Sequence, residues 1–292
     1  MERVVGVGCI AISAVGFGMM PLFANIAYQA GATPVSVLFL RFSIASLIML
    51  GITTKTQEAF PRGKSLLILV LMGAVGYAGQ SLSYFTALRF APAGLVAILL
   101  YIYPALVTGL SFIVFKHPIT RVKIFTLLLS LAGIPLVIGW QSGGQLLGIV
   151  LGLLAAIIYA VYIIIGAKVM QHTNAFVSST IIVTSAAVAF GGVTIWNGLS
   201  FPATLAGWGA ILGLALISTV VAIVMFFKGI QRIGPVDAAM LSTLEPVVAV
   251  GLASAFMGER LTMINLCGGL MILTAALLLA RFETAPAYAV ND

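Results

Sequence analysis

Ten stretches of mostly apolar residues follow one another along this 292-residue chain. Each has about the 20 residues that a helix needs to cross the roughly 30 Å hydrocarbon core of a bilayer, at about 1.5 Å per residue. The stretches are 4–28, 35–53, 65–88, 91–115, 122–140, 145–166, 176–196, 206–227, 236–257 and 262–280. The first is too long for a cleavable signal peptide and belongs to a series. The sequence therefore predicts an all-α polytopic membrane protein with ten transmembrane helices.

The composition excludes most classes of soluble protein. Hydrophobic residues make up 62% of the chain and charged residues only 7%, against about 25% charged residues in a soluble domain. Soluble enzymes, nucleic-acid binders and disordered scaffolds do not fit this balance. The two cysteines, Cys9 and Cys267, lie inside apolar runs without metal-ligand spacing, which is typical of small hydrophobic core residues. We expect no metal and no cofactor.

The basic residues predict the orientation in the membrane, because cytoplasmic loops retain Lys and Arg. With ten spans, the N-terminus and every even-to-odd connection share one side. That side collects Arg3, Lys55, Arg62, Lys64, Lys116, Arg121, Lys123, Lys168, Lys228, Arg232 and Arg281. The opposite side holds Arg89 and Arg260, and Arg41 lies within a span. We therefore expect both termini in the cytoplasm, and the net positive charge reflects topology and indicates no nucleic-acid partner.

An internal repeat divides the chain. The segments 103–109 and 245–251 each have Pro in second place and Gly in last place, and each is followed by an aliphatic-Thr pair, Ile119-Thr120 and Leu261-Thr262. We predict two five-helix repeats, 1–142 and 143–292. Because five is odd, the second repeat enters the membrane from the opposite face. Inverted repeats are common in secondary transporters, whose halves rock around a site near the midplane; a duplication without a transport role is the alternative.

The segment 258–262, which follows the ninth apolar stretch and precedes Gly268, resembles the EamA family of the drug/metabolite transporter superfamily. The first-half copy fits more loosely, with His117 where the second half has Glu259, and Arg41 is similar to an arginine of the family. The resemblance implies a secondary transporter of the bacterial inner membrane. In its length, its ten predicted spans and its tyrosine-rich middle, the chain is most similar to the YddG-type exporters of aromatic and other neutral amino acids. Other relatives move nucleotide sugars, triose phosphates or cationic drugs.

Candidate pathway residues follow from helical periodicity, because polar and small residues of a membrane bundle face its interior. Tyr103 falls on a more apolar face than Tyr101, so it ranks lower. The candidates for the substrate cavity are Tyr77, Gln80, Ser81, Tyr84, Tyr101, Tyr103, Tyr159 and Tyr162. The alternative for the tyrosines is a place in the aromatic belt at the membrane interface.

Glu245 is the only carboxylate deep inside a predicted span. An ionisable residue in a membrane is expensive and is a functional hypothesis by default. It would capture a substrate ammonium group or carry a proton; the alternative is a neutral strut between helices.

Several residues are predicted to loosen or kink helices. Gly16, Gly18 and Pro21 in the first span, with Pro104 and Pro246, are candidates for hinges or for close packing. Arg41 is expected to face protein or to extend to the interface, in a structural role. Glu259 and Arg260 are expected to form a loop pair rather than a gate.

The leading hypothesis is a secondary transporter that exports amino acids and related small amphipathic metabolites by alternating access. There is no Gly-x-x-x-x-Gly-Lys-Ser/Thr loop for ATP, and inward-facing mid-span Lys or Arg for phosphates are not evident. A multidrug or other metabolite exporter is the alternative within the superfamily. A passive channel is a second class, and an intramembrane enzyme a third, although the chain offers neither a carboxylate pair nor a zinc motif. The expected partners are the small-molecule substrate and the lipid bilayer, and a ten-span bundle can enclose a pathway as a monomer.

Overall fold

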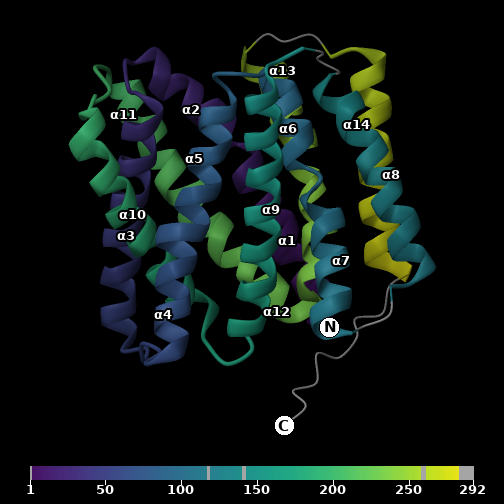
Figure 1. Cartoon of the computed structure of the whole chain (residues 1–292), viewed down its shortest axis with the longest axis horizontal. Coiled ribbons are helices and arrows are strands. Elements are labelled where there is room, and N and C mark those ends of the chain that lie inside the picture. The colour runs from purple at the N-terminus through teal and green to yellow at the C-terminus, as the bar shows by residue number, and fades with distance from the viewer. Residues whose placement is uncertain (1, 117–118, 140–142, 258–260, 283–292) are drawn as a thin grey trace.

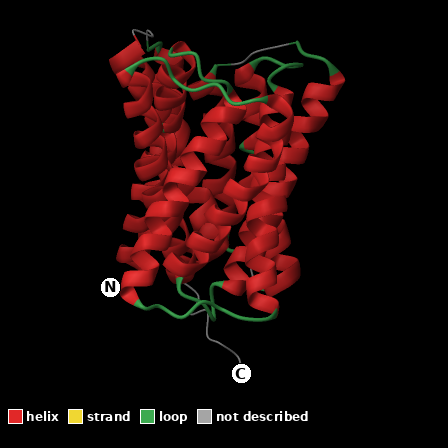
Figure 2. Cartoon of the chain, turned by 90° about the vertical axis from the view of Figure 1, so that its left-hand side faces the viewer, coloured by secondary structure: helices red, strands yellow, loops and turns green. Residues whose placement is uncertain are grey.

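The computed structural model describes residues 2–116, 119–139, 143–257 and 261–282. These residues form helices and connecting loops, and none of them lies in a strand (Figure 2). The first half contains α1 (Glu2–Gly18), α2 (Met20–Gln29), α3 (Pro34–Thr56), α4 (Lys64–Leu71), the π-helix η1 (Met72–Tyr77), α5 (Ala78–Ala87), α6 (Ala93–Leu100), α7 (Tyr103–Phe115) and α8 (Arg121–Ile138). The second half contains α9 (Leu146–Val169), α10 (Ala175–Asn197), α11 (Leu205–Ala215), the π-helix η2 (Leu216–Val221), α12 (Ala222–Leu241), the 3-10 turn η3 (Ser242–Leu244), α13 (Glu245–Met257) and α14 (Met263–Phe282).

In the described part of the chain, nine helical stretches are long and apolar enough to cross a membrane. Eight correspond to one predicted stretch each, whereas the stretch Leu205–Met257, of 53 residues, covers both 206–227 and 236–257. The predicted count of ten is therefore not confirmed. The reason is local: the expected loop is helical except at Gly234, whose φ of 80° and ψ of 168° interrupt the helix just before Pro235.

The distribution of side chains is that of a membrane protein. Large apolar side chains cover the outside, with Leu47, Ile195 and Leu205 exposed to 72%, 81% and 89%. Hydroxyl side chains such as Ser13 and Thr180 are fully buried. A soluble monomer rarely exposes extended apolar surface, so the all-α fold with apolar helices crosses a bilayer.

Helices from the two halves pack against each other along the bundle. α8 lies along α14, α3 along α10, and α5 along α9, as Figure 1 shows for the first pair at the right of the bundle. The crossing of α8 and α14 is closest at two glycines: a Cβ on Gly133 would lie 2.8 Å from the Gly268 carbonyl oxygen, and a Cβ on Gly268 2.7 Å from that of Gly133. Only small residues allow backbones to approach so closely in membranes.

Irregular backbone recurs at matching places in the two halves. The π-helices begin at Met72 and at Leu216. Further along each half, the helical backbone is interrupted again, at Tyr101–Ile102 after α6 and at η3 after α12. The distance in sequence from η1 to η2, and that from Tyr101–Ile102 to η3, are both close to the offset between the repeated segments 103–109 and 245–251. π-Helices and broken membrane helices are frequent at functional sites, so these four places locate the candidate site.

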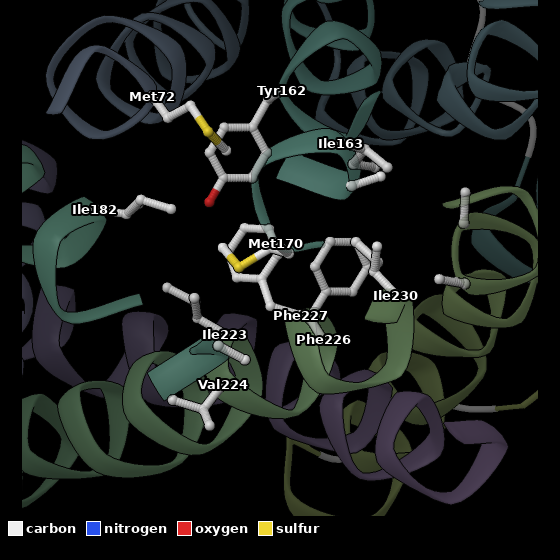
Figure 3. Packing of buried hydrophobic residues seen from close by; sticks show 14 of the residues in the cluster. Met72, Tyr162, Ile163, Met170, Ile182, Ile223, Val224, Phe226, Phe227 and Ile230 are labelled. Atoms are coloured by element: carbon white, nitrogen blue, oxygen red, sulfur yellow. The ribbon is translucent and has the colours of Figure 1, made fainter. Parts of the chain in front are cut away.

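The core joins both halves at the level of the π-helices. Met72 packs with Tyr162 of α9, Ile182 of α10 and Phe226 and Phe227 of α12 (Figure 3). Figure 3 also shows the hydroxyl group of Tyr162 turned toward the middle of this group. The tyrosine thus belongs to the interior of the bundle and not to an interfacial belt.

Candidate functional site

Two broken helices bring Tyr101 and Glu245 together. Tyr101 lies in the turn between α6 and α7, and Glu245 is the first residue of α13, directly after η3. The Tyr101 hydroxyl donates a hydrogen bond of 3.3 Å to Glu245 Oε2. Pro104 and Pro246 are each the second residue of the helix after the break, where the missing N–H costs little. The prolines therefore start new helices beside the site; whether they act as hinges stays a prediction.

Glu245 has unused bonding capacity. Its Oε1 atom is buried and accepts no hydrogen bond from any residue that the structure describes. A buried acceptor left without a partner costs about 1–3 kcal/mol, more when it is charged. The backbone beside it is tightly held, since a Cβ on Gly18 would lie 2.9 Å from the Glu245 carbonyl oxygen. The carboxylate is thus fixed in place with one oxygen available for a cationic ligand.

Five tyrosine side chains form a series of neighbouring rings that begins next to Glu245 and continues into the bundle. The ring centroids of Tyr101 and Tyr103 are 6.2 Å apart, and those of Tyr103 and Tyr159 are 4.6 Å apart. Tyr159 is followed by Tyr162 at 6.1 Å and Tyr162 by Tyr77 at 6.0 Å. These five tyrosines, here called the tyrosine row, come from η1, the α6–α7 segment and α9. Within the described ranges, the buried Tyr162 hydroxyl makes no hydrogen bond, so the row offers a polar atom as well as apolar faces.

The remaining predicted cavity residues lie on α5. Ser81 donates a hydrogen bond of 3.3 Å to the side-chain oxygen of Gln80. Tyr84 packs edge-on against Phe85, with 5.6 Å between ring centroids, and belongs to a small apolar cluster around Ala87. None of the hydrogen bonds or ring contacts described for these three residues joins them to the tyrosine row, so their part in the site stays a prediction.

The structure places Tyr103 in the interior of the bundle and not on the outer apolar face that helical periodicity gives it; its place in a substrate cavity stays a prediction. Its side chain is 1% exposed, it packs on Tyr159, and its hydroxyl lies 3.5 Å from the Ala239 carbonyl oxygen. The periodicity argument assumed one continuous helix through 91–115. The turn at Tyr101–Ile102 rotates the following residues, so Tyr103 faces the interior together with Tyr101.

The first span is broken where the small residues and proline lie. α1 ends at Gly18, and α2 begins at Met20, just before Pro21. Gly16 lies close to η2, since a Cβ there would be 3.0 Å from the Ile217 carbonyl oxygen. The predicted kink and close packing are thus present, and movement about the break stays a prediction.

The guanidinium group of Arg41, a residue expected to have a structural role, is buried inside the bundle. The residue is 2% exposed. Its Nε donates to Thr219 Oγ1 at 3.1 Å and its Nη2 to the Tyr77 hydroxyl at 3.2 Å. Of the two positions expected for Arg41, facing protein or extending to the interface, the structure shows the first. A single arginine within a span gives no sequence signal for its direction.

An ion-pair cluster at one end of the bundle was not predicted from the sequence. Asp237 is fully buried, with its two carboxylate oxygens 2.8 Å from Arg3 Nη1 and 2.8 Å from Lys123 Nζ. Arg3 also donates to the carbonyl oxygens of Leu279 and Ala280 in α14. This cluster, here called the Asp237 triad, ties α1, α8, α12 and α14 together. Asp237, at the start of the predicted stretch 236–257, is thus a second buried carboxylate besides Glu245.

Three residues singled out in the sequence, His117, Glu259 and Arg260, lie outside the described residues, as does the end of the predicted span 122–140.

Comparisons with known proteins agree on one family. A family model described as the EamA-like transporter family matches residues 4–139 and again residues 146–281. The chain is 26% identical to "Uncharacterized transporter YcbK" of Bacillus subtilis, over 97% of this chain and 96% of that protein. It is 25% identical to an "Uncharacterized transporter" of Archaeoglobus fulgidus, over 94% and 96%. A "Probable amino-acid metabolite efflux pump" of Salmonella typhimurium is 27% identical, over 67% of this chain and 70% of that protein.

The fold also has a solved counterpart. One crystal structure superposes with a TM-score of 0.79 over 95% of this chain and 96% of the other, at 18% sequence identity. At that identity the likeness shows a common fold.

Proposed function

Since this chain belongs to the EamA-like transporter family, we propose that it exports neutral amino acids, aromatic ones among them, by alternating access. The family assignment makes the chain a polytopic secondary transporter and not an enzyme. One observation above all supports an amino acid as the substrate: Glu245, a carboxylate with a free oxygen, lies at the end of the tyrosine row. The printed name of the Salmonella relative, and the resemblance to YddG-type exporters, support the same substrate class.

The proposed topology has ten crossings in two inverted repeats, 1–142 and 143–292. An unbroken helix of the length of Leu205–Met257 would be about 80 Å long, more than twice a hydrocarbon core of about 30 Å. A reversal at Gly234 makes it two crossings. The basic residues then place both termini on the cytoplasmic side of a bacterial inner membrane.

The chemistry of the site suits an amphipathic substrate with an ammonium group. The free Glu245 oxygen would accept a charge-assisted hydrogen bond from that group. The tyrosine faces would pack against an apolar or aromatic side chain and attract the cation. An organic cation without a carboxylate would meet the same two features, so a cationic drug is the second candidate substrate.

Alternating access requires each end of the bundle to open in turn. The Asp237 triad joins four helices at one end, and separating them would expose the site to that side. The break between α1 and α2 and the two π-helices are where the backbone would bend.

The test is counterflow in liposomes that contain the purified protein, with labelled phenylalanine, threonine and a cationic drug as three probes. Saturable counterflow of the amino acids, inhibited by unlabelled aromatic ones, is the expected result. Flux of the drug alone would contradict the amino-acid substrate. Flux that never saturates would identify a passive channel.

Tyr101→Phe should weaken substrate binding and leave the fold intact. The hydroxyl that holds Glu245 Oε2 is lost, and a net hydrogen bond of about 1 kcal/mol corresponds to about a fivefold rise in the apparent Kd for phenylalanine. Tyr103→Phe is the matched control, because its hydroxyl faces a backbone carbonyl at 3.5 Å and not the carboxylate. An equal effect of the two variants would argue against a specific role of the Tyr101–Glu245 contact.

A further inference from the structure

We infer that the Ser242 hydroxyl group is a second acceptor for the ammonium group of the substrate, beside Glu245 Oε1, so that the transporter selects primary over tertiary ammonium groups. The inference rests on the proposed amino-acid function and adds a residue that determines specificity at the Glu245 end of the tyrosine row.

Ser242 has a buried hydroxyl group without a hydrogen-bond partner. The residue is fully buried, and its Oγ atom makes no hydrogen bond with any residue that the structure describes. Serine and threonine within helices often donate to a backbone carbonyl one turn earlier. The neighbouring Thr243 does so, with 2.6 Å to the Met240 carbonyl oxygen. An unpaired buried hydroxyl costs about 1–3 kcal/mol, and a ligand that pairs with it recovers that free energy.

The break between α12 and α13 brings Ser242 and Glu245 to the same side. Ser242 is the first residue of the 3-10 turn η3, and Glu245 directly follows the turn. The Glu245 N–H group donates to the Ser242 carbonyl oxygen and so closes the turn. Side chains three residues apart eclipse each other in a 3-10 turn, and their Cβ atoms lie about 5–6 Å apart on a helix surface. The two side-chain oxygens therefore converge.

One nitrogen atom can reach both oxygens. An N–H···O hydrogen bond is about 2.9 Å long, so two oxygens up to about 5–6 Å apart can share one ammonium nitrogen. Tyr101 holds Glu245 Oε2, which leaves Oε1 for the ligand. The Tyr103 hydroxyl group lies near Ser242 but is directed at the Ala239 carbonyl oxygen, 3.5 Å away. The Ser242 oxygen is therefore open to a ligand.

The number of acceptors determines which ammonium groups fit. A primary ammonium group has three N–H donors and can pair with both oxygens at once. A tertiary ammonium group has a single N–H donor, and it would leave one buried oxygen without a partner. Ser242 thus distinguishes between the two candidate substrates, an amino acid and a cationic drug with a tertiary amine.

The experiment varies the number of N–H donors on one substrate. Phenylalanine, N-methylphenylalanine and N,N-dimethylphenylalanine lose one donor at each step, and each is measured as an inhibitor of labelled phenylalanine counterflow in liposomes. For the wild type we expect similar apparent Kd values for the first two, because both can satisfy both oxygens. The dimethyl compound should bind about tenfold more weakly, the equivalent of one hydrogen bond to a charged group. Similar affinities for the two methylated compounds would overturn the inference.

Ser242→Ala provides the second arm. Phenylalanine should bind about tenfold more weakly, and N,N-dimethylphenylalanine should keep its wild-type affinity, so that the preference disappears. The fold should survive, because alanine removes a hydroxyl group that has no partner among the described residues. Ser218→Ala is the matched control, since Ser218 is also fully buried with an unpaired hydroxyl group in that part of the chain but lies in η2. It should leave both affinities unchanged.

Other results would contradict the role of Ser242. An unchanged preference in Ser242→Ala, or an equal loss in Ser218→Ala, would overturn the inference. A preference that is lost because the dimethyl compound binds more tightly, with phenylalanine unchanged, would show that the serine only fills space. A sodium ion is the other cation that such oxygens could hold. Loss of wild-type counterflow when potassium replaces sodium would assign the two oxygens to that ion and overturn the inference as well.

The two hypotheses fail in different ways. Absence of amino-acid counterflow in the wild type contradicts the proposed function and this inference together. Amino-acid counterflow whose preference for the primary ammonium group does not depend on Ser242 contradicts the inference alone.

Discussion

Glu245→Gln should reduce phenylalanine counterflow by about 10- to 100-fold, the equivalent of a hydrogen bond to a charged group of about 1.5–3 kcal/mol. The amide keeps the shape of the side chain and still accepts from the Tyr101 hydroxyl, which lies 3.3 Å from the carboxylate. It lacks the negative charge that an ammonium group needs. Counterflow of labelled phenylalanine, measured with the protein reconstituted at equal density, gives the rate and the apparent Kd.

Two inhibitors of phenylalanine counterflow separate the possible roles of the Glu245 carboxylate. Phenylalaninamide keeps the ammonium group and lacks the carboxylate, and 3-phenylpropionate keeps the carboxylate and lacks the ammonium group. If Glu245 binds the ammonium group, phenylalaninamide should weaken with phenylalanine in Glu245→Gln, and 3-phenylpropionate should not. If Glu245 carries a proton instead, counterflow should survive while uptake driven by a pH gradient is lost. Glu58→Gln, which removes an exposed carboxylate from a loop, controls for the change in charge. Normal counterflow and normal pH-driven uptake in Glu245→Gln would leave only the packing role.

In the described part of the chain, eight of the nine candidate membrane spans each correspond to one predicted apolar stretch, because burial of the backbone in lipid requires long apolar helices. Periodicity and isolated polar residues also found much of the candidate site: Glu245, Tyr101, Tyr159, Tyr162 and Tyr77 lie in one contact network. A polar residue in an apolar run is a strong signal, since it has few favourable places other than the interior of the bundle.

The interruptions within these helices could not be predicted from hydropathy. The turn at Tyr101–Ile102 and the two π-helices lie inside long, mostly apolar stretches. A constant rotation per residue through the first of these stretches therefore gives Tyr103 the wrong face. Between the predicted stretches 206–227 and 236–257 the opposite happened. A loop was expected there, but the backbone is helical except at the single residue Gly234.

Contacts of charged residues with residues far away in the sequence could not be predicted either. Arg41 lacks an acidic neighbour in the chain, and its hydrogen-bond partners Tyr77 and Thr219 are neutral. Asp237 lies next to the start of a predicted span, where a charge is ordinarily solvated. Its cationic partners come from the first helix and from α8, which only the packing of the bundle brings together.

Asp237→Asn should destabilise the protein by about 3–5 kcal/mol, the usual cost of removing one partner from a buried ion pair. The change leaves Arg3 and Lys123, whose side chains are only 16% and 10% exposed, facing each other without the carboxylate. We expect a clear fall in the unfolding temperature of the purified protein in detergent. Glu2→Gln is the matched control, since Glu2 is 83% exposed and pairs with Arg232 at 3.3 Å, and an exposed pair contributes about 0–1 kcal/mol.

Variants of Lys123 test whether repulsion between Arg3 and Lys123 causes the expected loss of stability. Lys123→Met keeps the 2.8 Å pair between Arg3 and Asp237, so it should destabilise less than Asp237→Asn. The double variant Asp237→Asn/Lys123→Met removes one of the two cations that face the replaced carboxylate and should be more stable than Asp237→Asn alone, because it removes the repulsion between Arg3 and Lys123. A double variant that is less stable than both single ones would mean that packing, and not charge, holds this end together. The proposed mechanism requires this end of the bundle to open, so a weakened triad in a folded variant should also change the rate of counterflow. The Glu2→Gln control should leave that rate unchanged.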